Sequence, residues 1–175
     1  MRFMKKVLAI FCFIAITAAQ TTQPEVAMDH IKACYIYNFS RYIEWPLSYR
    51  QGNFVIDVLD GTPIMISELS KMAATQTAGS QKFEINNVLS VEKIGKCNIL
   101  YIPTNKSTAI KKAVLKLKNF STLIITDDDG ATKLGAAINF VVKDNRQKFE
   151  LNRNNAQKNK LIVSSNLATL AILVE

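Results

Sequence analysis

The chain has 175 residues, of which 49% are hydrophobic and 21% charged. This length leaves room for one domain of ordinary size with a substantial core. The moderate charge and the low content of glycine and proline exclude an intrinsically disordered chain. The net charge of +8 would favour a nucleic-acid partner for a cytosolic protein, but the first residues argue against that class.

The first 19 residues have the pattern of a secretory signal peptide. Residues 1–6 carry three basic side chains, residues 7–16 are apolar, and small residues follow up to Ala19. The apolar stretch is too short to span a bilayer comfortably; a retained N-terminal anchor is the alternative. Cleavage near Ala19 would leave an exported domain over residues 25–175 and lower the net charge to +5. We therefore expect no nucleic-acid partner.

An aromatic helix is predicted over residues 25–44. Apolar residues recur there every three or four positions, as they do on one face of a helix. The residues on this face are Met28, Ile31, Tyr35, Phe39 and Tyr42. Five of the chain's fifteen aromatic residues fall between Tyr35 and Trp45. Pro46 should end the helix at Trp45, because proline disfavours helical backbone at the residue before it.

Alternating strands and helices are predicted next. Near-continuous apolar runs are typical of strands that are buried on both faces. The expected strands are residues 53–59, 82–86, 98–103 and 121–126. The expected helices are residues 64–74 and 107–118, with a helical turn over 91–95. The second of these helices is clearly amphipathic, so one of its faces should cover the sheet.

The C-terminal part reads as a hairpin followed by helices. Residues 136–142 and 147–151 are apolar runs separated by four polar residues, which predicts two antiparallel strands. A short helix is expected over 152–159 and a last helix over 164–173, with Ser164 or Ser165 as its N-cap. The whole order predicts a single α/β domain with a mixed sheet of five or six strands flanked by helices.

Few residues offer catalytic chemistry. His30 is the single histidine, and neither a nucleophile-elbow nor a phosphate-loop motif is present. We interpret His30 as a surface or capping residue and expect a non-catalytic protein without a cofactor. Asp127, Asp128 and Asp129 follow a predicted buried strand, where open α/β sheets place ligand sites. They lack the alternating spacing of a calcium loop, and an Asx turn explains them more simply, so we expect no metal.

Two cysteines lie beyond the signal segment, Cys34 and Cys97. An exported compartment permits a disulfide between them. Cys34 lies on the predicted aromatic helix and Cys97 at the start of a strand. Two separate buried thiols are therefore the alternative.

Three blocks of sequence carry a resemblance. Residues 31–46, IKACYIYNFSRYIEWP, resemble the pattern KAAYIYNFAKYVEWP, with Cys34 where alanine is common. Residues 97–102, CNILYI, and several short motifs between Leu123 and Leu173 follow in order. Together these blocks resemble the YfiR/HmsC-type family of periplasmic proteins. The motif positions shared are Tyr35, Asn38, Phe39, Trp45, Gly135, Asn139, Phe140, Phe149, Glu150 and Asn152.

The resemblance implies a regulatory function in the periplasm. Known members repress an inner-membrane diguanylate cyclase by binding its sensor domain, which lowers cyclic-di-GMP signalling and biofilm formation. They are non-catalytic α/β proteins that tend to form homodimers, and some respond to redox state through disulfides. The implied partner is a membrane sensor protein, either a diguanylate cyclase or a sensor kinase. Ala136 replaces the second glycine of a family motif, and the familiar disulfide cysteines are absent.

Three hypotheses follow for function. In the first, Trp45, Pro46 and the loop of Asp127, Asp128 and Asp129 contact the membrane partner. A core anchor is the alternative for Trp45, and hydrogen bonding within the fold is the alternative for the polar motif residues.

The second hypothesis is a small-molecule-binding module that serves a sensor kinase or transporter. It would use an apolar pocket between the aromatic helix and the sheet. The third is a metal-dependent enzyme that uses the three aspartates.

Overall fold

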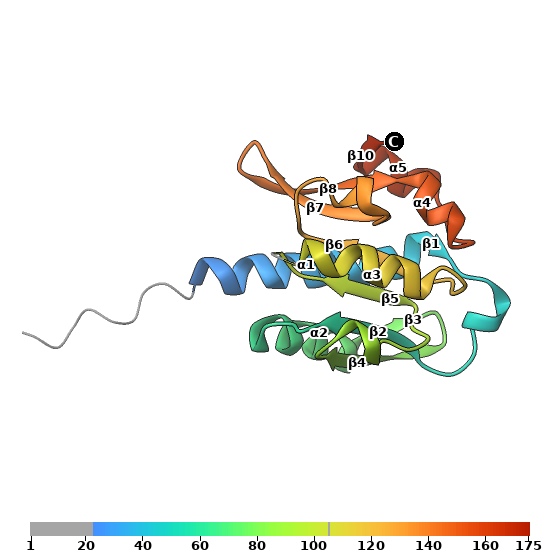
Figure 1. Cartoon of the computed structure of the whole chain (residues 1–175). Coiled ribbons are helices and arrows are strands. Elements are labelled where there is room, and N and C mark those ends of the chain that lie inside the picture. Colours follow the sequence, from blue (N-terminus) through green and yellow to red (C-terminus); the bar gives the residue numbers. More distant parts are fainter. Residues whose placement is uncertain (1–22, 105) are drawn as a thin grey trace, which may run out of the picture.

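The computed structural model describes residues 23–104 and 106–175. The predicted signal peptide, residues 1–19, lies outside the described residues. The centre of the fold is a mixed sheet of eight strands, in the order β10-β8-β7-β6-β5-β2-β4-β3. Figure 1 shows this sheet with β10 and β8 at the top and β4 at the bottom. The strands are β2 (Phe54–Leu59), β3 (Thr77–Ala78), β4 (Gln81–Val88), β5 (Ile99–Ile102), β6 (Leu123–Thr126), β7 (Ile138–Lys143), β8 (Arg146–Asn152) and β10 (Ile172–Val174).

Five neighbouring strands, β4, β2, β5, β6 and β7, run parallel to one another. The predicted hairpin is confirmed, because β8 pairs antiparallel with β7 from Ile138↔Leu151 to Lys143↔Arg146. All residues of β5 and β6 are buried, as expected for parallel strands that are covered on both faces. The continuous apolar runs NILYIP and STLIIT thus reflect their central places in the sheet.

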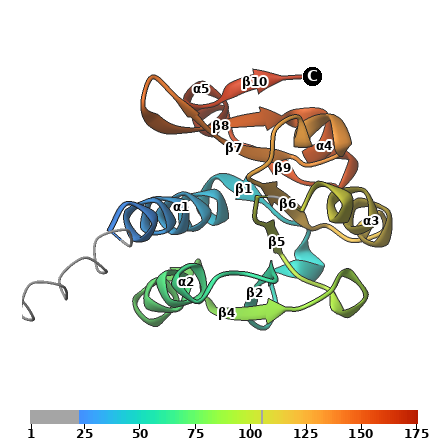
Figure 2. The same ribbon diagram turned by 60° about the vertical axis from the view of Figure 1, so that its left-hand side comes forward.

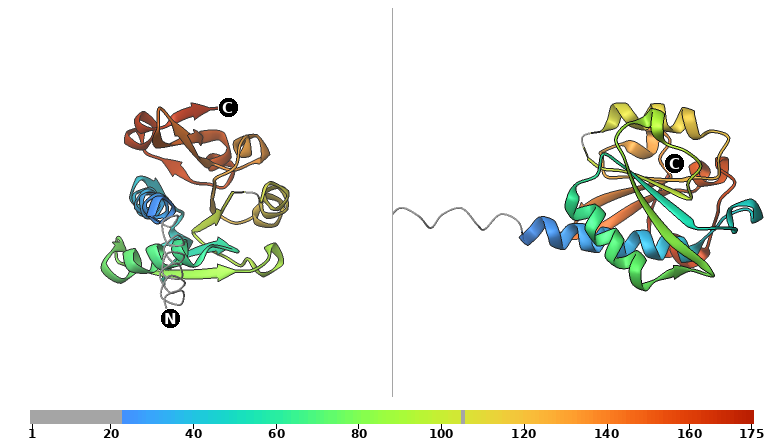
Figure 3. Two further views of the ribbon diagram at one scale, coloured as in Figure 1. Left: turned by 90° about the vertical axis from the view of Figure 1, so that its left-hand side faces the viewer. Right: turned by 90° about the horizontal axis from the view of Figure 1, so that it is seen from below.

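Helices cover both faces of the sheet (Figures 2 and 3). One face is covered by α1 (Gln23–Tyr42), α2 (Pro63–Thr75) and α5 (Ser165–Leu170), and the other by α3 (Ser107–Leu117). Two hydrophobic cores result, with Phe39 and Phe149 in the core under α1 and Ile110 and Leu117 in the core under α3. The short helix α4 (Arg153–Lys158) follows β8. The structure confirms a single mixed α/β domain, but with eight strands in its sheet where five or six were expected.

The helix predicted over residues 25–44 extends two residues too far at its C-terminal end. The helix ends at Tyr42 because strand β1 (Ile43–Glu44) pairs antiparallel with strand β9 (Ile162–Val163). The buried face of the helix is also shifted from the predicted one: Ala33, Ile36 and Phe39 are buried, whereas Ile31 is 39% exposed. Pairing with a distant segment therefore sets the end of this helix.

The predicted last helix, residues 164–173, is divided in the structure. Helix α5 ends at Leu170, and strand β10 then pairs parallel with β8. Ser164 is the N-cap, because its Oγ accepts a hydrogen bond of 3.2 Å from the Leu167 N–H. The extra strands β3 and β10 have two and three residues, which is too short for an alternating pattern to reveal.

Trp45 is a core anchor, which was the alternative to its interpretation as a partner contact. Its side chain is 5% exposed and packs edge-on against Phe54, with ring centroids 5.0 Å apart. The indole N–H donates to the carbonyl of Asn98 at 3.2 Å. The Trp45 side chain is therefore not available to a partner.

Cys34 and Cys97 are both free thiols, so the possible disulfide between them is not formed. Cys97 belongs to the core on the α3 side of the sheet, whereas Cys34 is exposed on α1, which covers the opposite face. Burial raises the pKa of the Cys97 thiol. The alternative of two buried thiols is right for Cys97 and wrong for Cys34.

The buried carboxyl group of Asp57 gives a testable pH dependence. Asp57 is 4% exposed, and burial raises its pKa above the ordinary 3.8, although a hydrogen bond from Asn86 opposes this. The folded state thus holds the proton more tightly than the unfolded chain, so stability falls as pH rises through the folded pKa. Removing the charge with Asp57→Asn should raise the free energy of unfolding at pH 7 by about 1 kcal/mol.

Urea unfolding at several pH values checks this prediction. The advantage of the asparagine variant should shrink as the pH falls below 3.8, where the Asp57 carboxyl group becomes protonated in both the folded and the unfolded state. A variant that is less stable than the native chain by the same amount at every pH would contradict it.

Candidate functional site

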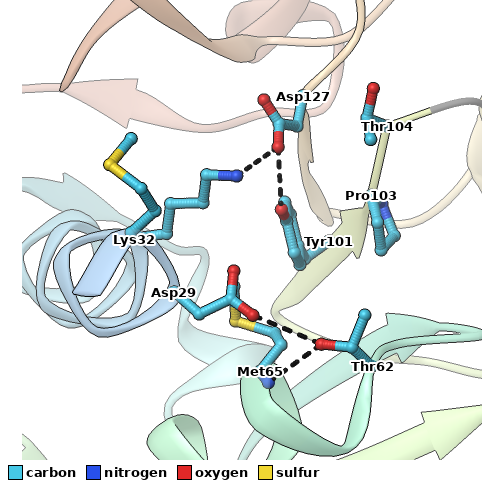
Figure 4. Close-up of a pocket in the computed structure, with 9 residues that line it drawn as sticks. Asp29, Lys32, Thr62, Met65, Tyr101, Pro103, Thr104 and Asp127 are labelled. Carbon is cyan, nitrogen blue, oxygen red and sulfur yellow. Dashed lines mark hydrogen bonds and ion pairs between the residues drawn. The ribbon is translucent and has the colours of Figure 1, made fainter. Parts of the chain in front are cut away.

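A cavity of about 310 Å³ lies at the carboxyl ends of the central parallel strands (Figure 4). The chain passes from β2 through α2 to β4 on one side, whereas β5 and β6 follow on the other side of β2. The crevice outside such a reversal of strand order is where open α/β sheets bind ligands. It is lined by residues of α1, by residues at or just after the carboxyl ends of β2, β5 and β6, and by one residue of α2. They are Met28, Asp29, Lys32, Thr62, Met65, Tyr101, Pro103, Thr104 and Asp127.

An ion pair between Lys32 and Asp127 lies on one wall of this cavity. The two side chains are only 13% and 21% exposed, so water screens their attraction less than at an open surface. The hydroxyl of Tyr101 donates to the same Oδ2 of Asp127 at 3.5 Å. Burial and the charge of Asp127 raise the pKa of Tyr101, which keeps this hydroxyl a donor. The contact joins α1 to the ends of β5 and β6.

A second polar contact joins α1 to the start of α2. Thr62 is the N-cap of α2, and its Oγ1 accepts from the Met65 N–H at 3.1 Å. The same hydroxyl donates to Oδ2 of Asp29 at 3.2 Å. Asp29 is buried. The cavity thus combines charged and hydroxyl groups with thioether walls, a lining suited to a small polar ligand.

The three predicted aspartates do not converge on one point. Asp127 lines the cavity, Asp129 is exposed, and Asp128 is half-buried. The Asp128 Oδ2 is buried and has no hydrogen-bond partner among the described residues. Nowhere in residues 23–104 and 106–175 do three or more His, Cys, Asp or Glu side chains group as metal ligands. The structure therefore offers the metal-dependent hypothesis no support.

The polar motif residues form hydrogen bonds inside the fold. Asn139 is 1% exposed; its Oδ1 accepts from the Thr126 hydroxyl at 2.8 Å and from the Asp128 N–H at 3.0 Å. Its Nδ2 donates to Oε2 of Glu150 at 3.2 Å. Asn139 thus fixes the aspartate loop to β6 and β8. The alternative of internal hydrogen bonding is confirmed for this residue.

Asn152 and Gly135 also have structural roles. The Oδ1 of Asn152 caps α4 by accepting from the Asn155 N–H at 3.0 Å. Gly135 has a φ of 112°, and a Cβ there would lie 2.9 Å from the Val114 side chain. Both the backbone conformation and the close approach of α3 require glycine. Ala136, where the family motif has a second glycine, is fully buried.

The aromatic motif residues build the core under α1. Phe39 lies with its ring centroid 5.0 Å from Phe149 and 6.1 Å from Phe140. Tyr35 lies 5.6 Å from Phe149. Asn38 and Pro46 are half-buried. Most of the motif positions therefore specify packing and leave the cavity lining to other residues.

A family model described as YfiR/HmsC-like matches residues 29–172. The chain belongs to the YfiR/HmsC-like family. This confirms the resemblance, and the match includes every residue named on the polar walls of the cavity. A search of curated proteins finds no match. Within the described part of this YfiR/HmsC-like chain, no helix is long and apolar enough to cross a membrane.

Sequence reasoning placed Asp127 near a ligand site but missed its partners. Lys32 was only one of several charged positions on a predicted helix, and Tyr101 lay within a strand. Thr62 stood in an ordinary turn. The one available signal was that Thr62 and Asp127 closely follow the strands predicted over residues 53–59 and 121–126, because ligand sites of open α/β sheets lie outside the carboxyl ends of their strands.

Asn139→Ala should lower the free energy of unfolding by about 2 to 3 kcal/mol, because it leaves the Asp128 N–H without its acceptor and removes the hydrogen bonds to Thr126 and Glu150. Chemical denaturation measures this. Asn154→Ala, at an exposed position of α4, is the control and should change stability by less than about 0.5 kcal/mol. Equal effects of the two substitutions would contradict the role assigned to Asn139.

Proposed function

We propose that the chain is a periplasmic regulatory protein that binds the sensor domain of an inner-membrane diguanylate cyclase. By repressing the cyclase it would lower cyclic-di-GMP signalling and biofilm formation. The observation that carries the proposal is the family match over residues 29–172. The basic N-terminal segment, which has the pattern of a cleaved signal peptide, supports export.

Internal packing of the motif residues narrows where a partner could bind. Trp45 is buried, but Leu47, two residues later, is 77% exposed. The other predicted contact, Asp129, is exposed at the tip of its loop. Leu47 precedes the amino end of β2 and Asp129 follows the carboxyl end of β6, so the two residues mark opposite edges of the parallel sheet. We therefore expect the partner domain to contact one of these two edges, so that substitution of the exposed residue there weakens its binding.

Binding of the exported form, beginning near residue 20, to the periplasmic domain of a membrane diguanylate cyclase encoded beside its gene tests the proposal. We expect micromolar or tighter affinity. Either Leu47→Asp or Asp129→Lys should weaken binding by about tenfold or more, as expected for substitution of an interface anchor. Leu115→Asp, on α3 at a position that is 69% exposed, is the matched control and should leave the affinity unchanged.

Calorimetry or a pull-down of that domain provides the readout, under both oxidising and reducing conditions. No binding at micromolar concentration in either condition would contradict the proposal. Equal loss with Leu47→Asp, Asp129→Lys and Leu115→Asp would show that neither edge is the contact.

The carboxyl-end cavity favours a second function, the binding of a small molecule. Its volume of about 310 Å³ is at the lower end of the range of small-molecule pockets. A thermal-shift screen of small polar metabolites tests this. A true ligand should raise the melting temperature of the native chain and lose its effect on Met28→Trp, which adds bulk at the cavity wall. Ile31→Trp, at an exposed position of α1, is the control and should retain the effect.

A further inference from the structure

A second groove, of about 300 Å³, lies between α1 and α2. It is distinct from the carboxyl-end cavity, with which it shares no lining residue. Its chemically active side chains are His30, Cys34, Glu68 and Lys71. Neither the proposed partner contacts nor the cavity uses any of them.

These side chains form a relay from a carboxylate through an imidazole to a thiol. Oε2 of Glu68 lies 2.8 Å from Nδ1 of His30. The other ring nitrogen, Nε2, lies 3.8 Å from Sγ of Cys34, within hydrogen-bond range for sulfur. His30 and Cys34 are four residues apart on α1, the spacing that places two side chains on one helical face.

The Glu68 carboxylate orients the imidazole. Hydrogen bonds from Lys71 and from His30 lower the pKa of Glu68, so its carboxylate stays ionised and accepts the Nδ1 proton. With the proton on Nδ1, the ring turns Nε2 towards the thiol as an acceptor, the arrangement that a general base requires. Lys71, whose Nζ lies 2.5 Å from Oε1 of Glu68, holds the carboxylate in place.

A metal ion fits this cluster less well than covalent chemistry does. Glu68 engages the nitrogen that faces away from the sulfur, so only Sγ and Nε2 could act as ligands. Zinc sites in proteins take three or four protein ligands, and the described residues contain no such group. The arrangement instead matches an activated nucleophile with a base and an orienting carboxylate.

We propose that Cys34 is a reactive thiol that undergoes thiol–disulfide exchange with small disulfides entering the α1–α2 groove. His30 Nε2 takes the proton of the thiol, and the thiolate attacks one sulfur of the disulfide. A new S–S bond forms to Cys34 as the original S–S bond breaks. The departing thiolate takes the proton from His30, so one disulfide and one thiol are present before and after the step.

The rate should depend on pH through this cluster. The charged and titratable groups that line the groove around it are Glu68 and Lys71 from α2, and Tyr37, one helical turn after Cys34 on α1. At a pH below the ordinary thiol pKa, near 8.5, the reaction depends on the base. At higher pH the thiol ionises without help, and the base no longer matters.

Stopped-flow reaction of the folded chain with dithiobis(nitrobenzoate), an aromatic disulfide, tests the proposal. At pH 6.5 the native chain should react about tenfold or more faster than His30→Gln. At pH 10 the two rates should converge, which shows that the substitution has not closed the groove. Glu68→Gln should also slow the reaction at the lower pH.

Cys34→Ala is the control, because it should abolish the fast phase, while buried Cys97 reacts only after denaturation. Equal rates for the native chain and His30→Gln at pH 6.5 would overturn the proposal. So would a fast phase that persists in Cys34→Ala. A His30→Gln variant that stays slow at pH 10 would indicate a structural role and would also overturn it.

Discussion

The structure depends on the contact between the aromatic face of α1 and the sheet. Phe39 is completely buried, and its ring lies edge-on to that of Phe149, with centroids 5.0 Å apart. Tyr35 and Phe140 extend the cluster, and Tyr101 brings in β5 through Phe140. Aromatic pairs in such arrangements contribute about 0.5 to 1.5 kcal/mol each beyond the burial of their area. The β7–β8 hairpin and the parallel strands thus share one covering helix.

Because α1 is held in this way, its other faces can present functional groups. Lys32 points to Asp127 at the end of β6, whereas Cys34 faces the groove beside α2. These side chains are two positions apart on the chain, so they point in well-separated directions on a helix of 3.6 residues per turn. The same buried contact therefore positions the carboxyl-end cavity and the thiol cluster. The YfiR/HmsC-like aromatic motif specifies the core, and both candidate sites are built on it.

Much of this fold could be predicted from local patterns. The apolar runs of β5 and β6 and the amphipathic α3 have strong signals, because each buries a whole strand or one helical face. The edge strands β3 and β10 and the small β1–β9 pair could not be predicted. Ile43 pairs with Val163, and no sequence pattern within either short segment predicts pairing with a strand so far along the chain. Competition from this pairing also ends α1 earlier than Pro46 would.

The candidate sites likewise combine features that local sequence predicts with contacts that only the packing of distant elements creates. The position of Asp127 after a buried strand was visible in the sequence, but its contacts with Lys32 and Tyr101 depend on how three elements meet. His30 was set aside as a single histidine with no catalytic motif. The four-residue spacing to Cys34 was present in the sequence, yet only the packing of α2 brings Glu68 to the imidazole.

A double-mutant cycle on Phe39 and Phe149 tests the central contact most directly. The free energies of unfolding of Phe39→Leu, Phe149→Leu and the double variant would be measured by urea denaturation. If the aromatic face of α1 holds the sheet as described, the two substitutions should be coupled by about 0.5 to 1.5 kcal/mol. Effects that add to within about 0.3 kcal/mol would contradict the account.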